Sequence, residues 1–412
     1  MKCALIGKPL GHSYSKEIHA LIAPYSYDLV ELDESEVAPY LRSRDFDGIN
    51  VTIPYKQTVM PLIDEISDEA KKIGAVNTIV NEGGRLVGYN TDFAGMRALI
   101  LKNGMDVSGK RALVLGTGGT SKTATEVLRS LGASEVIKVS RTAKDGAVSY
   151  TDAYEKHSDA QVIVNATPVG MYPHENEKPI DIGRLSCVEA VIDAIYHPLC
   201  TELVIDAKRK GIKACGGLYM LVAQAVYACG LFQNKEINAD VIDDVYEKVL
   251  AQKRNIVLVG MPSCGKSTIA NEFAKLTGRE AIDTDCEVQK RAGVSISQIF
   301  EKDGEGAFRK LESEVVSDVA SRSCVIVSTG GGVPLNDENV KKLARNGIIL
   351  FLDRNVDKLM ATSDRPLAQN AEAIKNLYEK RYPIYLKCAD ARIDSNGSVQ
   401  DTINSIRGLL KI

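Results

Sequence analysis

Two glycine-rich loops constrain the fold of this chain more than any other feature. Each loop stands between an apolar, strand-like run and an amphipathic helical pattern, in the segments 111–132 and 254–278. A strand, a glycine turn and a helix in this order form the unit that binds nucleotides in parallel sheets. Because strand-like runs and helical patterns alternate along the whole chain, the expected fold class is α/β.

The two loops predict separate domains. A chain of 412 residues is long enough for about two or three domains. Between the loops, apolar residues recur at helical spacing from Val241 to Leu250, and a new strand-like run starts at Asn255. We therefore expect a boundary near residue 252, with an N-terminal region over residues 1–252 and a C-terminal region over residues 253–412.

Composition and charge argue against several functional classes. A formal net charge of -3 gives no reason to expect nucleic acid as a partner. No apolar run approaches the roughly 18 to 20 residues of a membrane span, and the N-terminus lacks a signal-peptide pattern. Nine cysteines without a CxxC pair argue against a zinc site and against a disulfide framework. They favour reduced thiols and therefore a cytoplasmic location. The expected partners are small molecules, and the oligomeric state stays open.

The first loop, GTGGTS, predicts a dinucleotide site, although a plain turn between strand and helix is the structural alternative. Its third small position is Ser121, where glycine or alanine is usual. At the end of the next strand an NAD site usually has an acidic residue, but this chain has a cluster with hydroxyls and cations. These groups favour a binding site for the 2′-phosphate of NADP. The structural alternative is that the arginine is simply solvated at the end of the strand. The expected NADP-binding residues are Gly116, Gly118, Gly119, Ser140, Arg141, Thr142 and Lys144.

The second loop, GMPSCGKST, has the GxxxxGK[ST] spacing of a phosphate-binding loop. Backbone amides of such a loop surround the phosphates of ATP, the lysine reaches the β- and γ-phosphates, and the serine ligates Mg²⁺. All five histidines lie before residue 200, so the chemistry behind this loop works without histidine. The expected ATP-binding residues are Gly260, Ser263, Cys264, Gly265, Lys266, Ser267 and Thr268.

Short polar stretches precede and follow the first loop. Ser13 and Ser15 are expected on a loop after the first strand, and the next stretches contain Thr52, Lys56 and GYNTDFAG. Taken singly, these residues read as helix caps and turns. Together with NATPVGMYP, DAIYHPLCTEL and GGLYMLVAQA, they resemble the shikimate dehydrogenase family from residue 1 to about 250.

This resemblance implies NADPH-dependent reduction of 3-dehydroshikimate to shikimate. Lys56 and Asp92 would be the catalytic pair, since an ammonium beside a carboxylate can supply a proton and stabilise developing charge. A discontinuous substrate domain (1–101 plus about 218–252) would surround a Rossmann NADP domain (102–217). Thr167 would join the cofactor residues. The polar shell of the substrate would be Ser13, Ser15, Thr52, Asn77, Tyr196 and Gln224.

A second ordered set of motifs follows the phosphate loop. It comprises AIDTDCEVQ, GEGAFRKLESEV, VIVSTGGGVPL, SDRPLAQ and EKRYPIYLKCAD. Asp283 and Asp285 could point the same way from a strand end or cap a helix, and Arg309 could form surface ion pairs with Glu305 and Glu312. As a set, these motifs resemble shikimate kinase from about 254 to 412.

The second resemblance implies ATP-dependent phosphorylation of shikimate to shikimate 3-phosphate by a P-loop domain with a parallel sheet. Arg365 would be the arginine of a lid that closes over the transferred phosphate, and Lys358 is the nearest cation upstream of it. Lys266, Asp285 and Arg365 would be catalytic, and Asp283 would support Mg²⁺ beside Ser267. The shikimate-binding residues would be Asp285, Arg309, Gly331, Gly332 and Arg381.

The sequence therefore predicts two enzymes of consecutive reactions in one chain. One alternative is an NAD-dependent quinate/shikimate dehydrogenase fused to a less selective kinase, against which Arg141 argues. A second alternative is a non-catalytic metabolite sensor, which would not need the chemical residues. The residues that argue against the sensor are Lys56, Asp92, Lys266, Asp285 and Arg365.

Overall fold

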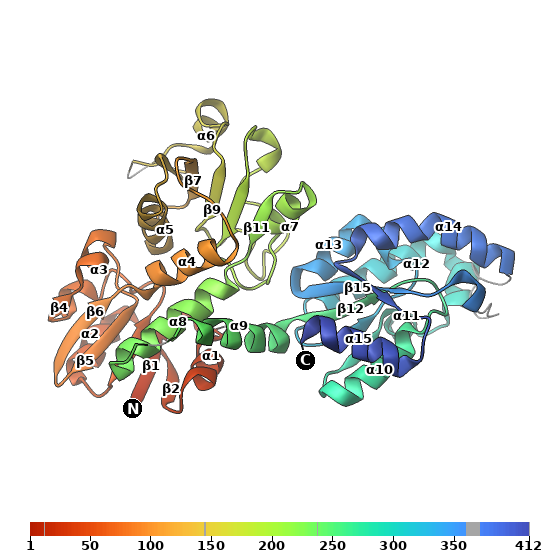
Figure 1. The fold of residues 1–412 in the computed structure, drawn as a ribbon, viewed down its shortest axis with the longest axis horizontal. Helices are drawn as coiled ribbons and strands as arrows, with labels where there is room; N and C mark the ends of the chain where they lie inside the picture. The colour runs from red at the N-terminus through yellow and green to blue at the C-terminus, as the bar shows by residue number, and fades with distance from the viewer. Residues whose placement is uncertain (12, 144–145, 237, 360–370, 412) are drawn as a thin grey trace. The chain divides into compact units, whose positions relative to one another are not determined.

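A computed structural model of the chain describes residues 1–11, 13–143, 146–236, 238–359 and 371–411 (Figure 1). Its contacts divide the chain into two compact units, Met1–Val249 and Leu250–Ile412. The first unit contains two sheets and the second contains one. Helices alternate with strands in both units, which confirms the α/β class. Within the described ranges, no helix combines the length and apolar character that a membrane crossing requires.

The N-terminal sheet has the order β2-β1-β3-β5-β6-β4. Neighbours run parallel at β2-β1-β3 and β6-β4, and antiparallel at β3-β5-β6. Its strands are β1 (Lys2–Gly7), β2 (Ser26–Glu31), β3 (Gly48–Val51), β4 (Glu65–Ile66), β5 (Thr78–Glu82) and β6 (Arg85–Tyr89). The helices around it are α1 (Ser15–Ile22), α2 (Glu34–Ser43), η1 (Met60–Leu62), α3 (Asp68–Ile73), α4 (Thr91–Lys102) and α8 (Leu218–Gln233), and α9 (Asp240–Lys253) follows α8 in the chain.

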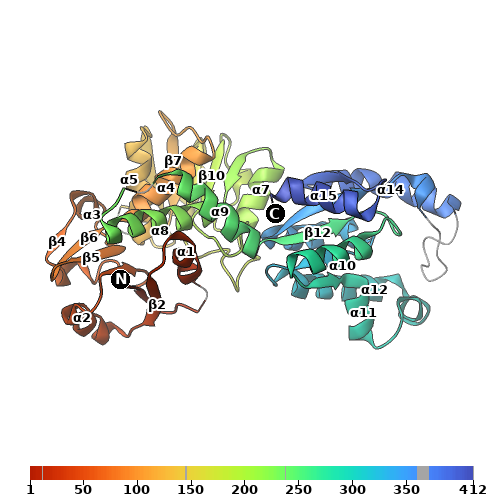
Figure 2. The same ribbon diagram turned by 60° about the horizontal axis from the view of Figure 1, so that its bottom comes forward.

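Helix α8 returns to this first sheet after the chain has built the second one. Figures 1 and 2 both show α8 alongside α4, and the two helices pack closely. A Cβ on Gly95 of α4 would lie 2.7 Å from the Met220 carbonyl oxygen of α8, so glycine is what permits this approach. At the far end of α8, Phe232 packs against Gly48 of β3.

The second sheet is wholly parallel in the order β11-β10-β9-β7-β8. Its central strands are continuous buried runs, as expected for strands that are covered on both faces. Its strands are β7 (Arg111–Leu115), β8 (Glu135–Val139), β9 (Val162–Asn165), β10 (Ala190–Asp193) and β11 (Lys213–Cys215). The helices are α5 (Gly119–Ser130), α6 (Tyr150–Lys156), η2 (Ile182–Arg184) and α7 (Glu202–Arg209).

The C-terminal unit has a parallel sheet in the order β13-β14-β12-β15-β16. Its strands are β12 (Asn255–Val259), β13 (Ala281–Asp283), β14 (Ile326–Ser328), β15 (Gly347–Asp353) and β16 (Ala391–Asp394). The helices are α10 (Lys266–Thr277), α11 (Thr284–Ala292), α12 (Ile296–Ala320), η3 (Val333–Leu335), α13 (Asp337–Asn346), η4 (Val356–Lys358), α14 (Ala371–Cys388) and α15 (Val399–Leu410).

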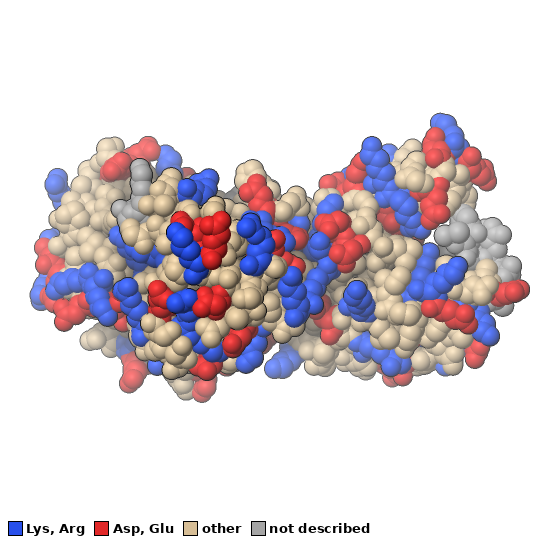
Figure 3. Space-filling model, turned by 90° about the horizontal axis from the view of Figure 1, so that it is seen from above, with Lys and Arg blue, Asp and Glu red and all other residues tan. Residues whose placement is uncertain are grey.

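Polar residues end several strands of both parallel sheets. Asn165 and Asp193 end β9 and β10, and Asp283, Ser328 and Asp353 end β13, β14 and β15. Ligands of such sheets bind outside the carboxyl ends of the strands. On the face drawn in Figure 3, in contrast, lysine and arginine side chains alternate with aspartate and glutamate.

Candidate active sites

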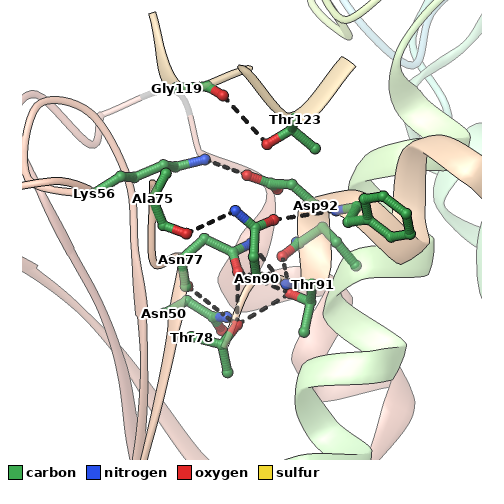
Figure 4. A network of polar contacts seen from close by, with 12 residues as sticks. Asn50, Lys56, Ala75, Asn77, Thr78, Asn90, Thr91, Asp92, Gly119 and Thr123 are labelled. Atoms are coloured by element: carbon green, nitrogen blue, oxygen red, sulfur yellow. Dashed lines mark hydrogen bonds and ion pairs between the residues drawn. The ribbon is translucent and has the colours of Figure 1, made fainter. Parts of the chain in front are cut away.

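A lysine–aspartate pair lies at the edge of the first sheet (Figure 4). Lys56 is in the turn after β3, and Asp92 is the second residue of α4. The Lys56 Nζ lies 2.5 Å from Asp92 Oδ2, and the two side chains are only 16% and 10% exposed. Because little water surrounds the pair, its electrostatic interaction is stronger than that of a surface ion pair.

A network of amides and hydroxyls fixes the start of α4 (Figure 4). The Asn77 Oδ1 accepts the Thr91 amide at 2.7 Å and the Thr78 hydroxyl at 3.1 Å. Asn90 caps α4 by accepting the Phe93 amide, and it donates to the Ala75 carbonyl oxygen at 2.9 Å. These bonds hold the backbone next to Asp92 in one position.

The network also reaches α8. The Thr91 hydroxyl lies 3.4 Å from Gln224 Oε1, and Gln224 is buried. The structure thus places Asn77 and Gln224, two of the expected substrate residues, on the same network as the residue that precedes Asp92.

The other expected substrate residues lie near the start of α1 and the end of β10. The Ser13 hydroxyl donates to Ser15 Oγ at 3.1 Å and accepts the Ser15 amide at 3.2 Å. The expectation that Ser15 lies on a loop is wrong: it is the first residue of α1, because the Ser13 hydroxyl binds an amide that the helix leaves unpaired.

Tyr196 follows β10, and its ring centroid lies 5.2 Å from that of Tyr14, between the two serines. Burial raises the pKa of Tyr196. Thr52 directly follows β3, and its amide donates to the Ile6 carbonyl oxygen at 2.9 Å. These residues come from both sheets of the first unit.

The first glycine loop links β7 to α5. Gly116 has a φ of 107°, and a Cβ there would lie 3.1 Å from the Ala166 carbonyl oxygen. Ser121 fits at the third small position because its hydroxyl donates to the Gly116 carbonyl oxygen at 2.6 Å. A Cβ on Gly119 would lie 3.7 Å from Lys56 Cδ, so the loop runs directly beside the lysine–aspartate pair.

The residues expected to select NADP lie at the end of β8. Arg141 and Thr142 are exposed, and the Ser140 amide donates to the Val148 carbonyl oxygen at 2.9 Å. Burial raises the pKa of Tyr150, the first residue of α6, and the charge of Arg141 lowers it. Lys144 lies outside the described residues.

A buried carboxylate, which no sequence motif marks, organises the loop that carries Thr167. The Asn165 Oδ1 accepts the Thr167 amide at 3.0 Å and its hydroxyl at 2.7 Å. The Asn165 Nδ2 donates to Asp193 Oδ1 at 3.0 Å. Asp193 also accepts the Ile195 amide at 3.0 Å and the Thr201 hydroxyl at 2.7 Å. Burial raises the pKa of Asp193 to about 6, although these hydrogen bonds lower it.

The second glycine loop joins β12 to α10. Gly265 has a φ of 99° and stands directly before the first helical residue, Lys266. Lys266 is buried, and its Nζ donates to the carbonyl oxygens of Gly260 at 3.0 Å and Met261 at 2.9 Å. The lysine therefore lies along the inside of the loop. The amides at the start of α10 make the loop suitable for phosphate groups.

Oxygen ligands gather beside this loop. The Ser267 hydroxyl donates to Asp283 Oδ2 at 2.6 Å, and the Ser328 hydroxyl donates to the same oxygen at 2.9 Å. The Asp283 Oδ1 accepts the amides of Asp285 and Cys286, so the helix-cap alternative for Asp283 is confirmed. A carboxylate and hydroxyl oxygens are the hard ligands that Mg²⁺ prefers. The residues present therefore fit magnesium.

The expected shikimate residues surround the three-glycine turn after β14. The Arg381 Nη1 donates to the Gly331 carbonyl oxygen at 3.0 Å. The guanidinium of Arg309 lies against Gly332, and the Asp285 carboxylate lies against Gly330.

The ion pairs expected for Arg309 are present, but one partner is not on the surface. Arg309 contacts the carboxylates of Glu305 at 3.0 Å and Glu312 at 2.9 Å. Glu312 is only 2% exposed. Burial raises the pKa of Glu312, and the charge of Arg309 lowers it. The buried Glu312 therefore holds the Arg309 guanidinium in place.

A single cavity of about 590 Å³ joins the phosphate loop to this second group of residues. One part of its wall is formed by the loop, and the other by α11, α12 and α14. Arg365 lies outside the described residues. The residues predicted from sequence that line the cavity are Ser263, Gly265, Lys266, Ser267, Thr268, Asp283, Asp285, Arg309, Gly331, Gly332 and Arg381.

Two family profiles match the chain, one in each unit. The family described as shikimate dehydrogenase substrate binding domain matches residues 5–79. The family described as shikimate kinase matches residues 262–410.

Individual relatives match the N-terminal region. A shikimate dehydrogenase (NADP(+)) of Clostridium beijerinckii is 35% identical over 257 residues, which is 59% of this chain and 95% of the relative. A crystal structure of shikimate dehydrogenase 1 from Peptoclostridium difficile is 35% identical with a TM-score of 0.56 and covers 60% of this chain and 98% of that one.

Two further solved structures are similar to this chain. A chorismate mutase/shikimate 5-dehydrogenase fusion from Clostridium acetobutylicum is 33% identical with a TM-score of 0.57, covering 60% of this chain and 96% of that one. A shikimate 5-dehydrogenase from Thermus thermophilus, in complex with NADP(H) and shikimate, is 30% identical with a TM-score of 0.55, covering 60% of this chain and 99% of that one.

Proposed function

The chain belongs to the shikimate dehydrogenase family and carries a shikimate kinase domain behind it, and from this premise we propose that it catalyses two consecutive reactions. The N-terminal region reduces 3-dehydroshikimate to shikimate with NADPH. The C-terminal region transfers the γ-phosphoryl group of ATP to shikimate, which gives shikimate 3-phosphate. The product of the first site is thus the substrate of the second.

The position of Lys56 supports the first reaction most directly. Its ammonium is 2.5 Å from the Asp92 carboxylate, and its stem lies beside the dinucleotide loop at Gly119. A proton donor is needed next to the cofactor because reduction of a ketone adds a hydride to carbon and a proton to oxygen. NADPH, when bound, supplies the hydride.

In this proposal Lys56 Nζ donates the proton to the substrate oxygen, and the ammonium stabilises the negative charge that develops there. Asp92 accepts a hydrogen bond from the same nitrogen and so orients it. Asn90 and Asn77 hold the first turn of α4, which keeps Asp92 in place. Ser13, Ser15, Thr52, Tyr196 and Gln224 bind the carboxylate and hydroxyls of the substrate.

Arg141 supports NADP as the cofactor. Its exposed guanidinium, at the end of β8, can bind a 2′-phosphate through two parallel hydrogen bonds. The neighbouring hydroxyls of Ser140 and Thr142 add donors to the same anion. Gly116, Gly118 and Gly119 leave room for the pyrophosphate at the start of α5.

The cavity that joins the two halves of the kinase site supports the second reaction most directly. Arg309 and Arg381 bind the carboxylate of shikimate, and Asp285 accepts the proton of the hydroxyl that attacks the γ-phosphorus. The new bond joins that oxygen to phosphorus, while the bond to the leaving ADP oxygen breaks. Lys266 exchanges its two carbonyl acceptors for phosphate oxygens, and Arg365 neutralises the transferred group.

Ser267 and Asp283 would hold Mg²⁺, with Ser328 as their neighbour. The ion, when bound, neutralises phosphate charge. We place the enzyme in the cytoplasm because all nine cysteines are free thiols, which a reducing compartment preserves.

Two separate assays test this function on the full chain. The first follows NADPH oxidation with 3-dehydroshikimate, and the second follows ADP formation from ATP, Mg²⁺ and shikimate. We expect activity in both. A chain that is inactive in either assay, while it still binds that assay's nucleotide, would refute the function of that half.

A further inference from the structure

Arg354 stands where the strand β15 ends beside the phosphate loop. The neighbouring strand β12 leads into that loop, and the two strands pair from Asn255 to Val259. A Cβ on Gly265 would lie 3.8 Å from Arg354 Nη1. The guanidinium is therefore next to the glycine that precedes Lys266.

Among the described residues, this guanidinium has no counter-ion. Within the part of the chain that the structure describes, Arg354 makes neither a hydrogen bond nor an ion pair, and its Nε is buried. The adjacent carboxylate, Asp353, is bound instead by Arg392 at 2.6 Å and by the Tyr382 hydroxyl at 3.4 Å. A partly buried cation without a partner costs free energy that an anion would recover.

Lys358, the cation that the sequence suggested for this side of the site, is occupied elsewhere. Its Nζ donates to the Asn396 carbonyl oxygen at 3.0 Å, in the turn after β16. Lys358 therefore stabilises a loop, and Arg354 is left to face the phosphate loop.

We propose that Arg354 binds the phosphate groups of the nucleotide held by residues 260–268. The proposal rests on the kinase function proposed above and adds a residue that no motif assigns. A guanidinium suits this role because its planar set of donors matches phosphate oxygens. Arg354 approaches the phosphates from the side of β15, whereas Lys266 lies inside the loop.

The test is calorimetric titration of the full chain with ADP and, separately, with adenosine. Arg354→Gln keeps a polar side chain with an amide donor but is shorter and removes the charge, so we expect ADP to bind at least tenfold more weakly and adenosine to bind unchanged. Arg354→Lys keeps the charge and should recover part of the ADP affinity. Lys358→Ala is the matched control and should leave ADP binding unchanged.

Two results would overturn the proposal. Unchanged ADP binding in Arg354→Gln would show that the guanidinium does not contact phosphate. An equal loss for ADP and adenosine would mean that the residue contacts the base or shapes the loop. The proposed kinase function fails separately, if the unaltered chain binds ADP but never phosphorylates shikimate.

Discussion

The backbone of Gly119 lies against the side chain of Lys56: a Cβ on the glycine would be 3.7 Å from Lys56 Cδ. The two residues come from different sheets of the first unit, Lys56 from the turn after β3 and Gly119 from the first turn of α5. A dinucleotide in the glycine loop would therefore lie next to the ammonium that is paired with Asp92. This contact brings the proposed proton donor to the cofactor.

The two activities should be separable by single substitutions. Lys56→Ala removes the proposed proton donor, so reduction of 3-dehydroshikimate should fall by about two orders of magnitude or more while phosphorylation of shikimate persists. Lys71→Ala, at an exposed lysine of α3, is the matched control and should affect neither rate. Steady-state rates of both reactions provide the measurement, and loss of both in a folded Lys56→Ala chain would contradict the proposal.

Arg141 should determine the preference for NADPH. Loss of a charge-assisted, two-point contact to a 2′-phosphate should raise the KM for NADPH roughly tenfold in Arg141→Ala, with little change for NADH. Arg129→Ala removes an exposed arginine in the last turn of α5 and should change neither constant. If NADPH and NADH weakened equally, Arg141 would be a structural residue.

The buried Asp193 should make the first unit less stable as the pH rises. Its pKa is about 6 in the folded chain against 3.8 for an ordinary aspartate, so between these values the folded state holds the extra proton. Stability from this group is complete below about pH 4 and is lost as the pH rises through 6. The loss amounts to about 3 kcal/mol.

Asp193→Asn abolishes this titration and provides the comparison. Calorimetry of both chains from pH 4 to 7 provides the measurement, and the transition of the first unit is the one whose midpoint temperature NADP⁺ raises. In this transition the unaltered chain should lose stability relative to the variant as the pH rises. A constant difference across this range would mean that the carboxylate does not titrate there.

Asp283 should set the magnesium requirement of the kinase. Asparagine still caps α11 but lacks the charge, so Asp283→Asn should raise the Mg²⁺ concentration for half-maximal phosphorylation several-fold without unfolding the chain. Glu287→Gln, on the same helix, is the control. An unchanged magnesium dependence would exclude Asp283 from the metal site.

Local pattern predicted much of this fold, because glycine turns and apolar periodicity act over a few residues. Each predicted loop follows a strand of one of the two parallel sheets. The helix cap at Asp283 was one of the two interpretations of its sequence. The sequence pattern does not place Ser15 in a helix, because the start of α1 depends on the Ser15 amide donating to the Ser13 hydroxyl, which composition does not reveal.

Long-range contacts limited what the sequence could predict about the sites. Lys56 and Asp92 are 36 positions apart and meet only because the strands between them fold back, so their pairing came from family resemblance. Asp193 and Asn165 are 28 positions apart, and no motif marks their bond. Arg354 is a single arginine at a strand end, and only its position beside Gly265 in the structure indicates a role in phosphate binding.

The central claim is that one chain converts 3-dehydroshikimate to shikimate 3-phosphate. The most direct test is a single incubation of the purified chain with 3-dehydroshikimate, NADPH, ATP and Mg²⁺, with NADPH, ADP and both products quantified over time. We expect one NADPH consumed and one ADP released for each shikimate 3-phosphate formed, and Lys266→Ala should stop the sequence at shikimate. Accumulation of shikimate without any phosphate ester in the unaltered chain, or no consumption of NADPH, would contradict the account.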